Sequence, residues 1–90
     1  MERAIIRRVA VRLNGGAVRG SSKALADVMG VPVKTARAWL LDPTQKNHRD
    51  MSKTAKRLFA LLVLLESTGR LDDRLIQAAI ATETLLENSD

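Results

Sequence analysis

The stretch "SKALADVMGVPVKTARAWL", Ser22–Leu40, decides the fold of this chain. Gly30 separates two short runs of sequence. In each run apolar residues recur every three or four positions, the spacing of an amphipathic helix. A glycine accepts the backbone conformation of a turn, and Pro32 is tolerated in the first turn of a helix because its missing N–H removes no bond. Two short helices joined by a tight turn are therefore predicted, a helix-turn-helix over about residues 22–41.

The spacing of residues around Gly30 supports this interpretation. Ala26, four residues earlier, is small enough to let the two helices cross closely. Ala36 and Trp39, three residues apart, would anchor the second helix to a core. Four residues are then expected to face outward from that helix: Val33, Lys34, Arg37 and Ala38.

The residues before this stretch predict one further helix. Ile6, Val9, Ala10 and Leu13 recur at helical spacing, and "NGGAVRG" then ends the pattern. Ser21 or Ser22 is expected to cap the helix that follows.

Two more helices are expected after it. Asp42 and Pro43 end the third helix and open a polar loop, "DPTQKNHRD". Ser52 or Asp50 can cap a fourth helix that reaches Glu66 and is apolar on almost every side of its second half, so we expect it at the centre of the domain. Gly69 is the expected stop, and a last helix should run over about residues 72–88. No strand pattern competes, which predicts an all-α fold with five helices in one domain, residues 1–90.

Composition narrows the class of protein. A chain of 90 residues with 46% hydrophobic residues supports one modest core, and the lack of cysteine excludes disulfides and thiolate metal sites. A reducing cytoplasm is therefore the expected compartment.

The longest apolar run, residues 58–65, is too short to span a bilayer, so no membrane association is expected. The start of the chain lacks the apolar core of a secretory signal, although an arginine-rich transit peptide could look similar.

The charge is distributed unevenly along the chain. Residues 1–57 carry thirteen Lys or Arg against four Asp or Glu, a net +9, whereas residues 58–90 carry two against six, a net −4. A basic excess confined to one part of a small domain is typical of proteins that bind a polyanion, most commonly nucleic acid.

On the residues quoted above, the chain resembles the lambda-repressor-like (Cro/Xre-type) helix-turn-helix DNA-binding proteins, and the five-helix order extends the resemblance over most of the chain. It implies a recognition helix, Pro32 to Leu41, in the major groove of double-stranded DNA. We expect a dimeric repressor that binds an inverted repeat and needs no cofactor or metal. No small-molecule effector is expected either, because so short a chain offers no obvious place for one. The loop and the long helix after it suggest a narrower resemblance, to phage or mobile-element autorepressors of the anti-CRISPR-associated (Aca) type.

The resemblance also implies roles for individual residues. By position, Val33, Lys34, Arg37 and Ala38 match the base-contacting residues of the family. Ser22 stands where the family often has a glutamine, which puts that side-chain contact in doubt. The expected phosphate-contacting residues are Ser21, Ser22, Lys23, Thr35, Lys46, Asn47, His48 and Arg49. Independently of the resemblance, the last helix is either a cover for the core or a dimer surface. The small core and the apolar stripe on this helix favour a dimer surface, formed by Leu75, Ile76, Ala79 and Ile80.

Two other functions remain open at this point. The chain could be an antitoxin-like protein-interaction module whose DNA binding is secondary, or an architectural protein that coats DNA without sequence preference. An enzyme is not expected, because the sequence offers no paired acids, metal ligands, activated nucleophile or phosphate-binding glycine loop. His48, the only histidine, has no acid and nucleophile arranged around it in sequence.

Overall fold

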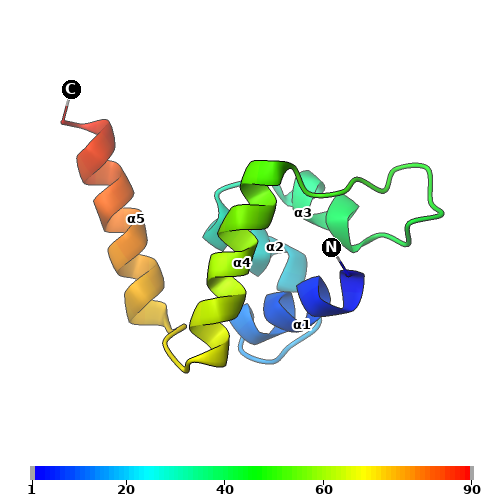
Figure 1. Ribbon diagram of the computed structural model, residues 1–90, viewed down its shortest axis with the longest axis horizontal. Coiled ribbons are helices and arrows are strands. Elements are labelled where there is room, and N and C mark those ends of the chain that lie inside the picture. The colour runs from blue at the N-terminus through cyan, green and yellow to red at the C-terminus, as the bar shows by residue number, and fades with distance from the viewer. Residues whose placement is uncertain (1, 90) are drawn as a thin grey trace. The chain divides into compact units, whose positions relative to one another are not determined.

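The computed structural model describes residues 2–89 and is built from helices alone. The helices are α1 (Arg3–Leu13), α2 (Ser21–Met29), α3 (Val33–Leu40), α4 (Lys53–Ser67) and α5 (Asp73–Glu87) (Figure 1). No strand occurs within residues 2–89, so the predicted all-α class with five helices is confirmed. The chain divides into two compact units, Met1–Ala60 and Leu61–Asp90, with the division inside α4.

The first unit holds the helix-turn-helix. α1, α2 and α3 pack against one another, as Figure 1 shows, and each contributes buried apolar side chains. Ala36 is fully buried and Trp39 almost so, which confirms that these two residues anchor the second helix of the motif in the core; Ala26 is also buried. Phe59 on α4 is also fully buried. The largest fully buried side chains of the described chain are Phe59, Leu25 and Val9.

The turn between α2 and α3 is three residues long. Gly30 has a left-handed backbone with φ of +71°, and the N–H of Val31 donates to the carbonyl of Ala26 over 3.1 Å, which closes the end of α2. Pro32 lies just outside α3, and its carbonyl accepts the first N–H groups of that helix, from Thr35 at 3.0 Å and Ala36 at 3.2 Å. The helix therefore begins one residue later than expected.

The start of α2 differs from the prediction. The cap is Gly20, in a left-handed conformation with φ of +87°, and no side chain caps the helix. Ser21 is the first helical residue and is buried. The preceding loop is held instead by Asn14, whose Nδ2 donates to the carbonyls of Ala17 at 2.9 Å and Arg19 at 2.7 Å. The prediction of a serine cap was wrong because Asn14 fixes the loop and glycine takes the cap position.

The ends of α4 and α5 follow the expected capping chemistry. The hydroxyl of Ser52 accepts the N–H of Ala55 at 3.1 Å, and the carboxylate of Asp72 accepts the N–H of Leu75 at 2.8 Å. Gly69 has a positive φ, and the N–H of Arg70 donates to the carbonyl of Leu65 at 2.8 Å. The predicted limits of both helices therefore hold to within one residue.

The predicted central position of α4 was wrong for much of its second half. Phe59 and Leu62 are buried, but Leu61 is 50% exposed and Leu64 is 59% exposed. Residues three apart share one side of a helix, so Phe59 and Leu62 mark a buried side of α4 and Leu61 and Leu64 mark an exposed one. Apolar character on every side of the helix did not translate into burial on every side.

Replacing Gly30 tests how much the turn depends on its left-handed backbone. A Cβ at this position would meet no atom within 4 Å, so Gly30→Ala adds backbone strain without a clash. We expect the free energy of unfolding to fall by about 1 kcal/mol in a urea titration. Gly30→Asn should lose less, because asparagine tolerates this conformation. An alanine variant as stable as the parent would contradict this account.

Candidate nucleic-acid interface

Three of the four residues predicted to contact bases lie on the outward side of α3, and the fourth lies at its edge. Successive residues of a helix are turned by about 100°. The core therefore receives one side of α3, formed by Ala36, Trp39 and Leu40. Lys34 and Arg37 are exposed on the opposite side, and Val33 and Ala38 at its flanks are half-buried. The structure thus brings Lys34, Arg37 and Ala38 onto a single face, with Val33 at its border with the buried side.

That face forms one wall of a groove. The groove has a volume of about 730 Å³. Its lining residues are Lys34, Thr35, Arg37, Ala38 and Leu41 from α3 and its end, and Asn47 and Arg49 from the loop that follows. Three of the seven are cationic and none is acidic, so the groove favours an anionic or hydrogen-bond-accepting partner.

The second wall is the segment 42–50, which we call the basic loop. Its backbone is tied to α3, because the N–H of Arg49 donates to the carbonyl of Ala38 over 3.1 Å. At its start, the Asp42 carboxylate accepts the N–H of Thr44 at 2.9 Å and the hydroxyl of Thr44 at 2.8 Å. These two hydrogen bonds lower the pKa of Asp42. The loop therefore has a defined shape rather than being a loose polar tract.

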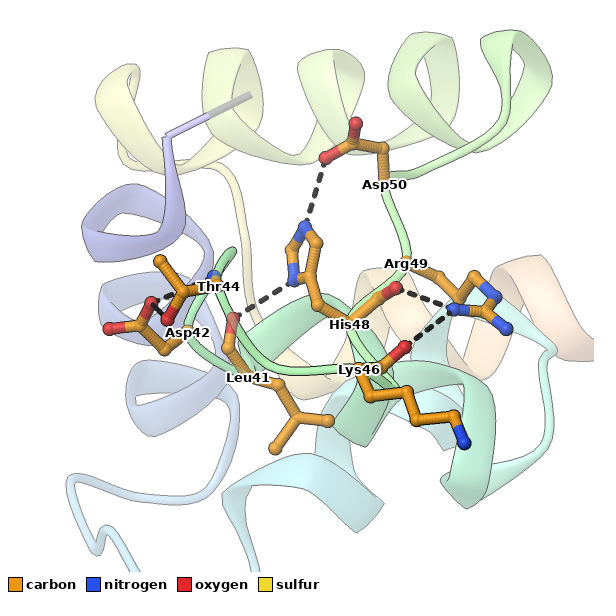
Figure 2. Close-up of polar contacts among 7 residues, drawn as sticks. All are labelled: Leu41, Asp42, Thr44, Lys46, His48, Arg49 and Asp50. Carbon is orange, nitrogen blue, oxygen red and sulfur yellow. Dashed lines mark hydrogen bonds and ion pairs between the residues drawn. The ribbon is translucent and has the colours of Figure 1, made fainter.

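His48 ties the basic loop together. Figure 2 shows its ring between the end of α3 and Asp50, with Nδ1 2.9 Å from the carbonyl oxygen of Leu41 and Nε2 3.1 Å from Oδ1 of Asp50. Only 15% of the side chain is exposed. A carbonyl and a carboxylate can only accept hydrogen bonds, so the ring satisfies both partners when both nitrogens carry a proton. His48 thus holds both ends of a short chain segment with one side chain.

Arg49 and Lys46 extend from the basic loop on the side away from Asp42, as Figure 2 shows. Nη1 of Arg49 donates to the carbonyls of His48 at 2.8 Å and Lys46 at 3.3 Å. The guanidinium is therefore held by the loop's own backbone while it lines the groove beside α3.

The other predicted phosphate-contacting residues lie at the first turn of α2. Ser21 is buried, Ser22 is half-buried, and Lys23 is exposed and pairs with Asp27 over 2.9 Å. An exposed ion pair of this kind contributes little free energy, so Lys23 can exchange its partner for a phosphate. None of these three residues lines the groove.

The predicted dimer residues share one side of α5. Leu75 and Ile80 are exposed, Ala79 is also exposed, and Ile76 is half-buried. α5 contains no buried residue. Its apolar stripe is therefore only partly covered within residues 2–89.

The tie through His48 was not predicted from the sequence. The ring joins Leu41, seven residues earlier, to Asp50, two residues later, within a segment that is neither helix nor strand, so no periodic pattern predicts either contact. The only available signal was a histidine two residues before an aspartate in a loop that closes onto a helix end. From the sequence, His48 was expected to contact phosphate, because no partner for its ring could be identified.

The pairing of Asp50 with His48 predicts a pH-dependent stability. The hydrogen bond from His48 lowers the pKa of Asp50 below its ordinary value of about 4. The unfolded chain then binds more protons than the folded chain between the two pKa values. The stabilisation is complete above about pH 4 and is lost as the pH falls through the folded-state pKa. In thermal unfolding, Asp50→Asn should be less stable than the parent at pH 6, and the difference should shrink toward pH 3.

The matched control removes the other partner. In a His48→Ala background, Asp50→Asn should have little further effect at either pH, because the hydrogen bond is already absent. A loss from Asp50→Asn that is the same at both pH values and in both backgrounds would assign the effect to something other than this pair.

Comparisons with known proteins add no relative. No family model matches the chain, and neither the curated proteins nor the solved structures contain a significant match. Within residues 2–89, no helix combines the length and apolar character needed to cross a membrane. The functional argument therefore depends on the residues and geometry described above.

Proposed function

We propose that the chain is a sequence-specific regulator of transcription that binds double-stranded DNA through α3 and the basic loop. The observation that carries the proposal is the groove on the outward face of α3. Within a helix-turn-helix, three cationic side chains line that groove and no acidic side chain does. A face of this kind suits the edges of base pairs flanked by phosphates.

The chemistry of the outward face fits reading of the major groove. The side chains of Arg37 and Lys34 can donate to O6 and N7 of guanine, while Val33 and Ala38 can contact the methyl group of thymine. Thr35, Lys46 and Asn47 would contact phosphates at the edges of the interface, joined by Ser22 and Lys23 from the start of α2. His48 and Ser21 would support the interface from within, since both side chains are largely buried.

A homodimer is part of the proposal. The stripe formed by Leu75, Ile76, Ala79 and Ile80 leaves apolar surface open on a helix with no buried residue. A second copy of the chain could cover it. Two-fold symmetry would then present two copies of α3 to successive major grooves about 34 Å apart, which fits an inverted repeat. Occupation of such a site within a promoter would repress transcription, and autoregulation in the manner of small phage or mobile-element repressors is the finer form of this proposal.

Selection of bound sites from a random duplex library tests the central claim. At about 150 mM salt, where non-specific electrostatic binding is weak, we expect an enriched inverted repeat. Recovery of DNA without a shared motif would favour an architectural protein. A stable complex with another protein on co-purification, together with no enriched motif, would favour an interaction module such as an antitoxin.

Single substitutions separate base contacts from phosphate contacts. Arg37→Ala should cost about 1–3 kcal/mol on the selected site and relax the preference at particular base pairs. Lys46→Ala should weaken selected and random DNA alike and reduce the salt slope by about one. Affinities measured over a series of salt concentrations distinguish the two. Equal losses of Arg37→Ala on both DNAs would refute its role in base contact.

The dimer is tested by placing a charge on each side of α5. Ile80→Glu puts a carboxylate in the apolar stripe and should shift the protein to the mass of a monomer in sedimentation equilibrium. Ala81→Glu adds the same charge on the other side of the helix, also at an exposed residue, and should leave the dimer intact. An unchanged dimer in Ile80→Glu would place the interface on another surface.

A further inference from the structure

We propose that Arg49 is a specificity-determining residue, which donates two hydrogen bonds to the edge of a guanine beside the base pairs contacted by α3. The basic loop would then read sequence, rather than only hold phosphates. This inference rests on the proposed function and names a reading residue that lies outside the helix-turn-helix.

The first support is the position of Arg49. Its backbone N–H is bonded to the carbonyl of Ala38, which belongs to the outward face of α3. Its side chain lines the same groove as Lys34 and Arg37. DNA that places the edges of its bases against Arg37 and Ala38 therefore also places neighbouring base edges close to Arg49.

The second support is the set of donors that the guanidinium leaves available. Nη1 is used by the carbonyls of His48 and Lys46. Within residues 2–89, no hydrogen bond is made by Nε or Nη2 of Arg49. These two N–H groups lie on one edge of a planar group and point in nearly the same direction. Such an edge matches O6 and N7 of guanine in a bidentate contact.

The third support is the fixed position of this donor edge before DNA arrives. An arginine side chain ordinarily loses much conformational freedom when it is immobilised, which weakens binding. Here the contacts of Nη1 to two carbonyls of the loop restrict the guanidinium in the free protein. A restricted donor pair discriminates between bases better than a mobile cation, because it cannot adjust to a wrong base at little cost.

Lys46 provides the contrast within the same loop. It contributes only its carbonyl to the loop's hydrogen bonds, it is exposed, and it does not line the groove. Its ammonium group is a mobile point charge, which suits a phosphate. The two cations of the basic loop are therefore assigned different partners.

His48 acts as a positioning residue for Arg49. Its ring joins the end of α3 to Asp50, on either side of the segment that supplies both carbonyl partners of Nη1. Removal of the ring should release Arg49 more than Arg37, because Arg37 is held by its helix.

The test is selection from a random duplex library with four proteins: the parent, Arg49→Ala, Arg49→Lys and Lys46→Ala. We expect Arg49→Ala to lose the preference for guanine at one position of each half-site while the rest of the motif stays. At that position, the parent should discriminate against other bases by about 5- to 150-fold, and the alanine variant by less than about 3-fold. Arg49→Lys should keep most of the overall affinity but little of this preference, and Lys46→Ala should leave the motif unchanged.

The outcomes separate this inference from the proposed function. An Arg49→Ala variant that binds all sites more weakly but selects the parent motif would show a phosphate contact and overturn the inference, while the proposed function stands. No motif for the parent protein would refute the proposed function itself. The readout is the pattern of preference rather than total affinity, so partial unfolding of a variant cannot imitate the expected result.

His48→Ala supplies the test of positioning. We expect it to reduce discrimination at the base pair assigned to Arg49 and to spare the base pairs assigned to Arg37. An equal loss at all positions would show that His48 stabilises the whole interface and would remove its specific role.

Discussion

Burial of one side of α3 is the constraint on which the rest of the structure depends. Ala36, Trp39 and Leu40 have almost no exposed surface, so the helix cannot rotate about its axis without bringing polar side chains into the core. That single restriction decides which residues face outward. It also decides where the basic loop can attach, because the carbonyl of Ala38 accepts the N–H of Arg49 at the edge of the outward face.

The basic loop shows how a short polar segment acquires a fixed shape without a core of its own. Asp42 and Thr44 close its first turn, His48 bonds to the end of α3, and backbone bonds join Gln45 to Asp42 and to His48. Each of these interactions is small in isolation. Together they satisfy enough polar groups that the loop is a wall of the groove, and the cationic side chains gathered there share one surface with those of α3.

Local patterns in the sequence were sufficient for the helices and for the turn at Gly30, because these depend on periodicity and on backbone preferences within a few residues. The core role of Trp39 followed from its spacing to Ala36 for the same reason. Features that depend on contacts with residues distant in the sequence could not be predicted from local patterns. The cap of α2 depends on Asn14, which closes a loop across several residues, and the exposure of Leu61 and Leu64 depends on what covers α4. The outward set on α3 followed from the sequence, whereas the joining of Arg49 to that set did not.

The chemical make-up of the basic loop has a consequence for how its binding preference could change over time. Gln45 and Lys46 enter the loop's hydrogen bonds only through backbone atoms, and Asn47 enters none of those within residues 2–89. The side-chain bonds come from Asp42, Thr44, His48, Arg49 and Asp50. Mutations at those three positions would alter the side chains shown to a ligand while leaving the loop's scaffold in place. The protein thus separates residues that maintain shape from residues free to diversify, and a lineage could explore new targets here without first finding a compensating mutation.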